Sequence, residues 1–222
     1  MLIKPSEPKG KLDTVTVNGP EDIPDWDAIN WRVHEGNVRG LRRRIFKATR
    51  EQDWATVRSL QKMMLRSWSN TLVSVRQVTQ RNAGRRTPGV DGQVALSSTT
   101  RAEMAVLVHR TISTWDPVPV RSVYVPKANG KRRPIGIPVL TDRCHQARVR
   151  HALEPEWEAR FEPKSYGFRP GRGCADAIAS LFTTLKGASK RVWIVDADLS
   201  AAFDRIDHDR LLAALGSFPP GT

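Results

Sequence analysis

A short acidic run near the C-terminal end of the sequence is the first candidate for chemistry. Asp198 closes an apolar segment, Arg191 to Leu199, whose composition predicts a strand. A carboxylate at the end of a strand is costly unless it binds something. Hard divalent cations such as Mg²⁺ take carboxylate oxygens together with water and phosphate oxygens, and two such ions can assist in-line phosphoryl transfer. The alternative is helix capping, since Asp204 or Asp207 can begin the helix expected from Asp207 to Leu215.

Basic residues gather around a predicted turn in the middle of the sequence. Lys127 and Arg133 lie six residues apart across this turn, with Lys131 and Arg132 between them. Arginine presents a planar fork to phosphate oxygens and lysine presents a point charge, so the pair suits a triphosphate better than a single duplex phosphate. The alternative is a charged hairpin tip that contacts only water.

A glycine-rich loop further along the chain interleaves aromatic and basic side chains. They are Tyr166, Phe168, Arg169 and Arg172. Glycines let a nucleic-acid backbone approach closely, and aromatic rings can stack on bases. Aromatic residues that follow a helix also commonly pack against the protein itself. The loop is therefore a candidate for nucleic-acid contact, with simple packing as the alternative.

The charge balance favours a polyanionic partner. The chain has 36 Lys and Arg residues against 23 Asp and Glu residues, a formal net charge of +13. A surplus of this size attracts phosphate backbones through counterion release, although a basic surface can also serve solubility alone. No stretch approaches the roughly 20 apolar residues needed to cross a bilayer, and no apolar run follows the first residues. We therefore expect a cytoplasmic protein without a membrane partner.

Two helices are expected in the first third of the chain, after a flexible leader at residues 1–24 that is rich in proline and glycine. The first begins near Trp31 and is predicted to be amphipathic. Its apolar positions are Val38, Leu41 and Ile45. The second is capped by Asp53, and its apolar repeat continues to Val75.

The outer faces of these two helices carry the candidate RNA-binding residues. They are Arg39, Arg42, Arg43, Arg58, Lys62 and Arg66. A solvated charged face is the alternative, but two successive arginine-rich faces in so basic a chain favour RNA contact.

The remaining elements mix helices with short strands, which predicts the α+β class. A turn-rich break at residues 85–92 precedes them. Strands are expected from Val120 to Pro126 and from Arg132 to Ile137, joined by a hairpin turn at Asn129-Gly130. Helices are predicted for Thr100 to Trp115, Thr141 to Phe161 and Ala175 to Leu185. The apolar face of the second of these is expected to be Val149, Leu153 and Trp157.

Four segments, in this order along the chain, resemble the successive blocks of group II intron reverse transcriptase/maturases. They are TPGVDG at residues 87–92, VPKANGKRRPIGIP at 125–138, YGFRPGR at 166–172 and ADLSAAFDRIDH at 197–208. The resemblance implies the fingers and partial palm of a right-hand polymerase, preceded by a helical N-terminal extension. The corresponding division is a leader at 1–24, a basic helical extension at 25–92, fingers at 93–190 and the start of a palm at 191–222.

The resemblance also implies roles for individual residues. Asp198 matches the first catalytic aspartate, which binds both Mg²⁺ ions, and the backbone carbonyl of Leu199 contributes to the same metal site. Phe203 matches the aromatic residue that disfavours a ribose 2′-hydroxyl. Lys127 and Arg133 match the residues of the fingers that hold the incoming triphosphate.

The block that contains Arg169 and Arg172 lines the templating region in this family, so the resemblance implies template contact for these arginines. The implied function is that of an RNA-directed DNA polymerase of a group II intron, which binds intron RNA and assists splicing and retrohoming. Its expected partners are intron and template RNA, a DNA primer and deoxynucleoside triphosphates.

The second catalytic block of this family, an aromatic-Ala-Asp-Asp hairpin, is absent from the sequence. The 222-residue chain alone is therefore not expected to polymerise. Two alternative functions stay open. One is a maturase that binds intron RNA and assists splicing without polymerising, and the other is a group II-like enzyme recruited to a CRISPR or diversity-generating system.

Overall fold

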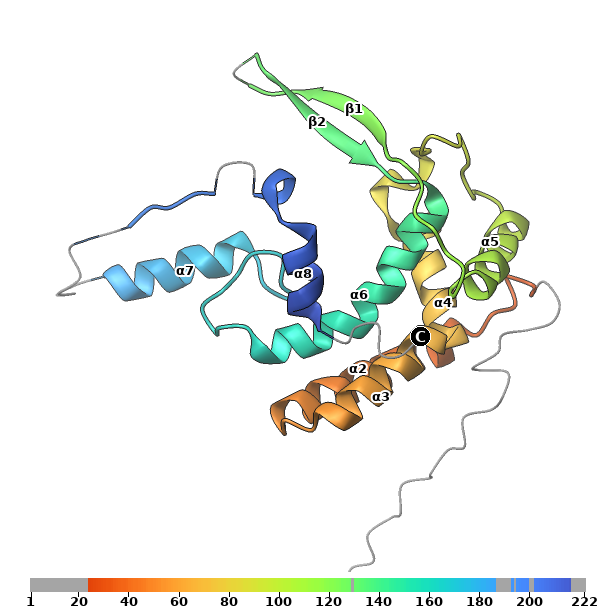
Figure 1. The fold of residues 1–222 in the computed structure, drawn as a ribbon, viewed down its shortest axis with the longest axis horizontal. Helices are drawn as coiled ribbons and strands as arrows, with labels where there is room; N and C mark the ends of the chain where they lie inside the picture. The colour runs from red at the N-terminus through yellow and green to blue at the C-terminus, as the bar shows by residue number, and fades with distance from the viewer. Residues whose placement is uncertain (1–23, 129, 187–192, 194, 200–201, 217–222) are drawn as a thin grey trace, which may run out of the picture.

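The computed structural model describes residues 24–128, 130–186, 193, 195–199 and 202–216. Helices make up most of this part of the chain, and a hairpin projects from them (Figure 1). The leader expected over residues 1–24 lies outside the described residues except for its last residue. Among the described helices, none is both long and apolar enough to cross a membrane.

Helix α2, Trp31–Arg50, is the amphipathic basic helix predicted from the sequence. Asn30 caps its first turn with a side-chain oxygen. The three apolar positions are buried as predicted; they are Val38, Leu41 and Ile45. The arginines of the same helix lie on the remaining surface, so the expected separation of apolar and basic faces is confirmed.

The second predicted helix is two helices in the structure, α3 (Trp54–Arg66) and α4 (Trp68–Arg76). Asp53 caps α3 as expected, accepting a hydrogen bond at 3.0 Å from the amide three residues later. The prediction of one continuous helix to Val75 is wrong because Ser67 adopts an extended conformation, with ψ of 124°, and caps α4 with its hydroxyl. A serine hydroxyl can replace backbone hydrogen bonds in this way, and an unbroken apolar repeat conceals the change.

Short turns follow α4 and lead into the turn-rich break predicted at residues 85–92. A π turn, η1 (Gln77–Arg81), and a 3₁₀ turn, η2 (Ala83–Arg86), precede the irregular segment at residues 87–92. This segment passes very close to the start of the next long helix. A Cβ atom on Gly89 would lie 2.6 Å from the backbone of Val139, so only glycine fits at this position.

Helix α5, Ser98–Arg110, ends before its predicted limit at Trp115. The Trp115 side chain instead packs on the long helix α6 (Leu140–Arg160). Its indole N–H donates to the Asp142 carboxylate at 2.9 Å, and its ring stacks on the His145 ring with centroids 4.6 Å apart. These contacts with α6 require the chain to leave the axis of α5, which explains the early end of the helix.

The predicted hairpin is confirmed and consists of β1 (Arg121–Pro126) and β2 (Arg132–Ile137), paired antiparallel. It projects away from the helices at the end of the molecule where α6 begins (Figure 1). Its connection, residues 127–131, is longer than the expected two-residue turn, and Gly130 adopts a φ of 76°. Glycine tolerates this left-handed conformation without strain. Asn129, the other residue of the predicted turn, lies outside the described residues.

Helix α6 occupies nearly the predicted range, Thr141 to Phe161, but the predicted apolar face is not the most buried side of the helix. The expected apolar face is only half-buried; it comprises Val149, Leu153 and Trp157. The fully buried side includes Arg148 and His151, which form hydrogen bonds inside the protein. Arg148 donates to the carbonyls of Val108 at 2.7 Å and Leu65 at 2.6 Å. Hydrophobic periodicity cannot identify a face whose polar groups are buried with their hydrogen-bond partners.

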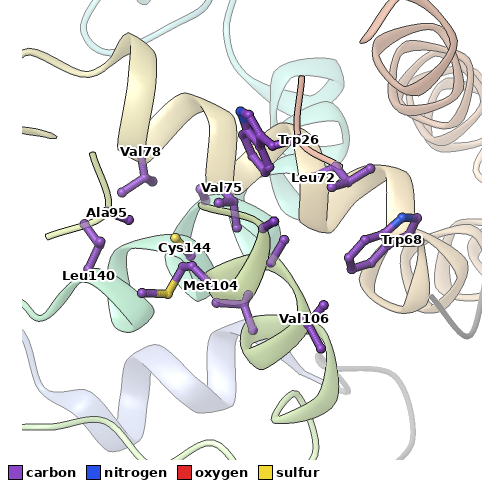
Figure 2. Close-up of a cluster of buried hydrophobic side chains, with 14 residues drawn as sticks. Trp26, Trp68, Leu72, Val75, Val78, Ala95, Met104, Val106, Leu140 and Cys144 are labelled. Atoms are coloured by element: carbon purple, nitrogen blue, oxygen red, sulfur yellow. The ribbon is translucent and has the colours of Figure 1, made fainter. Parts of the chain in front are cut away.

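Two clusters of buried apolar side chains hold the helices together. The larger cluster joins α4, α5 and the first half of α6, and it includes Trp26, Leu72, Met104 and Cys144 (Figure 2). The smaller cluster joins α2 and α3 to Ala152 of α6. Because the larger cluster contains residues from both sides of position 92, the segments on either side of this position share one core.

Two further helices occur where they were predicted, α7 (Cys174–Leu185) and α8 (His208–Leu215). Asp207 caps α8 and accepts a hydrogen bond from the Arg210 amide at 3.1 Å. The capping role that was an alternative for Asp207 is therefore confirmed.

The strand predicted from Arg191 to Leu199 is not found in its described residues, 193 and 195–199. Residues 191, 192 and 194 lie outside the described part of the chain. A strand needs a neighbour for its backbone hydrogen bonds, and in the part that the structure describes β1 and β2 pair only with each other. The described fold is therefore mainly helical with one small antiparallel sheet, which agrees with the mixed composition expected.

Candidate functional site

The two cations predicted to bind a triphosphate share one face of the hairpin. Arg133 lies directly opposite Val125, and the amide of Lys127 continues the ladder by donating to the Lys131 carbonyl at 2.7 Å. Because side chains alternate along a strand, Lys127 and Arg133 extend to the same side. Both are exposed, and within the described part of the chain neither forms an ion pair. They can therefore bind a phosphate without losing a partner.

The arginines of the glycine-rich loop are already bonded within the protein. Arg169 is buried, with 7% of its surface exposed, and donates to both carboxylate oxygens of Glu158 at 2.7 and 2.9 Å. It also donates to the carbonyls of Glu162 and Ser165. Arg172 donates to the same Ser165 carbonyl at 3.1 Å. The structure brings the two predicted template-binding residues together, but their donors hold the loop, and template contact stays a prediction.

This network fixes the chain next to Phe168, whose backbone conformation is unusual. Phe168 has a φ of 57°, which is unfavourable for a bulky side chain, and its ring is fully exposed. The adjacent Arg169 forms a bidentate pair with Glu158, and the hydrogen bond from Arg169 lowers the pKa of the Glu158 carboxyl. The ionised pair therefore persists at neutral pH and helps to hold an aromatic ring in solvent.

The residues expected at the metal site are all exposed. Asp198 and Leu199 lie in irregular backbone, and Phe203 begins the short 3₁₀ turn Phe203–Arg205. A carboxylate and a backbone carbonyl are oxygen ligands of the kind that Mg²⁺ takes together with waters and substrate phosphates. Among the described residues, no group of three or more His, Cys, Asp and Glu side chains is placed to hold a metal ion. The donors at Asp198 and Leu199 suit an ion that is also bound by its substrate.

The basic residues predicted to bind RNA divide into paired and unpaired groups. Arg39 and Arg43 are exposed one helical turn apart on α2, and neither has an ion pair among the residues described. Arg42 lies between them and forms an ion pair with Glu154 of α6. The predicted residues on α3 are exposed or half-buried; they are Arg58, Lys62 and Arg66.

Phe46 is a further exposed residue on the basic side of α2 that was not among the predicted site residues. Its side chain is 40% exposed and lines a hollow together with Arg39 and Arg43. The sequence contained a signal for it, because a large aromatic residue on the polar side of an amphipathic helix is out of place for simple folding.

The buried histidines of α6 do not provide acid–base groups for neutral pH. Burial lowers the pKa of His151 to about 3, with Arg42 and Arg150 adding to the effect. His151 lies 2.7 Å from the side-chain oxygen of Asn70, to which its ring N–H donates. Burial likewise lowers the pKa of His145 to about 4. Both rings are neutral parts of the core, and the candidate site is composed of cations, exposed aromatics and Asp198.

Comparison with known families gives two successive matches along the chain. Residues 26–107 match a model described as the N-terminal domain of reverse transcriptase. Residues 125–221 match a model described as reverse transcriptase (RNA-dependent DNA polymerase). The first match covers the helices from α2 to most of α5, and the second begins in the hairpin and includes Asp198.

The chain is also similar to three curated proteins. The chain is 39% identical over 149 residues to protein YkfC of Escherichia coli, an alignment that covers 65% of this chain and 39% of that protein. It is 36% identical over 135 residues to group II intron-encoded protein LtrA of Lactococcus lactis subsp. cremoris, an alignment that covers 60% of this chain and 22% of that protein. It is 29% identical over 178 residues to maturase-like protein 1 of Euglena gracilis, an alignment that covers 79% of this chain and 39% of that protein. The chain thus spans 39% or less of the length of these relatives.

Proposed function

Because the chain belongs to the group II intron reverse transcriptase/maturase family, we propose that it serves an RNA-directed DNA polymerase that binds intron RNA and assists splicing and retrohoming. The observation that carries this proposal is the consecutive match of residues 26–107 and 125–221 to the two reverse transcriptase models. The proposed partners are intron and template RNA, a DNA primer and deoxynucleoside triphosphates. The net charge of +13 suits these polyanions.

In this proposal the chain supplies the first parts of a right-hand polymerase. Residues 25–92 form a helical extension, residues 93–190 form the fingers and residues 191–222 begin the palm. The hairpin supports the assignment of the fingers, because it projects from the helices (Figure 1) and nearly all of its strand residues are exposed to a substrate. Lys127 and Arg133 bind the triphosphate from one face of this hairpin.

Asp198 and the carbonyl of Leu199 would hold Mg²⁺ beside the bound triphosphate. The ion supplies positive charge that neutralises phosphate oxygens as the phosphoryl group is transferred. Phe203, five residues beyond Asp198, lies against the sugar of the incoming nucleotide and excludes a 2′-hydroxyl by its bulk. Arg169 holds the loop that borders the template. Its buried, bidentate pair with Glu158 supports a positioning role in addition to any contact with RNA.

Replacing Asp198 in the complete protein tests this proposal. Asp198→Ala removes the carboxylate that holds the metal, so DNA synthesis on an RNA template should fall by several orders of magnitude in a primer-extension assay. RNA binding should stay unchanged because Asp198 is exposed and is not one of the basic residues expected to bind RNA. Asp209→Ala is the matched control, since it removes an exposed carboxylate in the first turn of α8. Near-normal synthesis by Asp198→Ala would contradict the assignment of this residue.

A further inference from the structure

A hollow on the surface of α2 combines cations, an aromatic ring and an apolar floor. We call it the α2 groove. It has a volume of about 300 Å³ and lies between α2, the end of α6 and the loop that follows α6. The side chains from α2 are Arg39, Arg42, Arg43 and Phe46, and Pro155 and Pro170 come from the opposite side.

The charged side chains that line the α2 groove have a net positive charge once their ion pairs are taken into account. Glu158 lines the groove, but both of its oxygens accept hydrogen bonds from Arg169. Arg42 also lines it and is neutralised by its ion pair with Glu154. Arg39 and Arg43 have no ion pair within the described part of the chain. Two guanidinium groups, one helical turn apart, are therefore available to anionic groups of a ligand.

Phe46, the aromatic residue of the α2 groove, belongs to neither of the two buried apolar clusters. The buried side of α2 is formed by Val38, Leu41 and Ile45, and Phe46 lies on the adjoining polar side. Its side chain is 40% exposed and lines the groove together with Arg39 and Arg43. A flat ring flanked by cations suits a ligand with a π face and neighbouring negative charges, because base–aromatic stacking accepts any base and arginine binds phosphate.

We propose that the α2 groove binds an unpaired nucleotide of RNA, with the base stacked on Phe46 and the adjacent phosphates bound by Arg39 and Arg43. This inference rests on the proposed function only in taking RNA as the partner. A base inside a duplex presents its edges and hides its faces, so the ring of Phe46 can stack only on a base that has left a helix. The groove therefore selects loops, bulges or ends of a folded RNA.

The experiment compares a short unstructured oligoribonucleotide with an RNA duplex of equal length, both titrated against the 222-residue chain by fluorescence anisotropy. Phe46→Ala should weaken binding of the single strand about fivefold to a hundredfold, the range found for base–aromatic stacking, and should leave duplex binding unchanged. Phe46→Trp should retain the affinity because it keeps a ring. Equal thermal midpoints of the variants show that the fold is intact.

The arginines have their own matched control. Arg39→Gln and Arg43→Gln should each lower the slope of log affinity against log salt by about 0.7 on the single strand, the value for one phosphate contact. Arg44→Gln removes the same charge from an exposed position on another side of α2 and should leave this slope unchanged.

Three outcomes would overturn the inference. If Phe46→Ala bound the single strand as tightly as the wild type, and binding stayed sensitive to salt, the protein would bind RNA without placing a nucleotide in the α2 groove. Equal effects of Arg39→Gln and Arg44→Gln would show that charge acts without a defined site. If RNA did not bind in the α2 groove, and an acidic peptide bound there in a way that Phe46→Ala abolished, the groove would belong to a protein partner.

Discussion

Arginine side chains serve two different purposes in this protein. Arg148 and Arg169 are buried, and their guanidinium groups donate to backbone carbonyls or to Glu158. Arg39 and Arg43 are exposed on α2. A phosphate that took a buried arginine away from its partners would leave those groups unsatisfied, at a cost of about 1–3 kcal/mol for each. Nucleic acid should therefore bind the exposed group, and the buried group should fix the surfaces on which it binds.

Phe203 offers a test of an individual residue in the proposed polymerase. Phe203→Ala in the complete protein should preserve incorporation of deoxynucleotides and raise incorporation of ribonucleotides, because it opens space beside the 2′ carbon. A change in shape of this kind alters discrimination by about tenfold to a hundredfold. The measurement is the ratio of kcat/KM for deoxy- and ribonucleotides in primer extension.

The control for this prediction is Phe203→Tyr, which keeps the ring and should keep the discrimination. Folding is not expected to change in either variant, since Phe203 is 80% exposed in a short turn. If Phe203→Ala discriminated as well as the wild type, the ring would not contact the sugar, and the role transferred to this position would be incorrect.

The sequence did not distinguish buried arginines from exposed ones. Arg169 and Arg172 lie among aromatics and glycines, a setting as suitable for RNA as that of Arg39 on α2. The difference comes from Glu158, which precedes Arg169 by 11 residues and meets it only after the chain reverses direction at the end of α6. Contacts of this type depend on tertiary structure, so residue types and spacing alone do not reveal them.

Elements with local signals at both ends were predicted well. Helix α8 has its cap at Asp207, and the hairpin has alternating strands around a glycine that adopts positive φ. The break at Ser67 and the buried face of α6 were missed for a physical reason. Ser67 is a cap inside a continuous apolar repeat, and α6 buries Arg148 and His151 with hydrogen-bond partners from other helices. Those partners are distant in sequence, so periodicity cannot include them.

The proposed binding of the triphosphate by the hairpin can be tested with two substitutions. Lys127→Ala and Arg133→Ala in the complete protein should each lower kcat/KM for deoxynucleotides about tenfold or more, because a hydrogen bond to a charged group contributes about 1.5–3 kcal/mol. The loss should come mainly from a higher KM if both residues hold the triphosphate before chemistry. Steady-state primer extension with varied nucleotide concentration measures it.

Arg121→Ala is the matched control for the hairpin prediction. Arg121 is exposed at the other end of β1, and strand alternation places it on the same face as Lys127. An equal loss in Arg121→Ala would indicate a general effect of charge, and no loss in any of the three variants would exclude the triphosphate from this face.

In the whole molecule, α6 links the two ends of the candidate site. It packs on α2, α3, α4 and α5, and β2 leads into its first turn, while the glycine-rich loop follows its last turn (Figure 1). A helix of 21 residues is about 30 Å long. The hairpin and the glycine-rich loop are therefore held apart by a rigid spacer, and the shared core around α6 ties this spacer to the basic helices.

The same core makes stability depend on pH. The pKa of His151 is about 3 and that of His145 is about 4 in the folded protein, chiefly because both are buried, against an ordinary value of 6.5. As pH falls below about 6.5, the unfolded chain takes up protons that the folded chain refuses. The free energy of unfolding should therefore fall with pH from about 6.5 towards 4, by about 1.4 kcal/mol per pH unit for each histidine.

Urea unfolding of the 222-residue chain at pH 7 and pH 5 measures this effect, with an expected loss of about 2 kcal/mol for each histidine. His151→Gln should reduce the loss, since glutamine can donate to Asn70 without titrating, whereas His208→Gln on exposed α8 should not. Equal stability at the two pH values would mean that the rings are protonated in the fold. Arg42 and Arg150 raise the cost of a charge on His151, so such a result would require α2 and α6 to separate around His151.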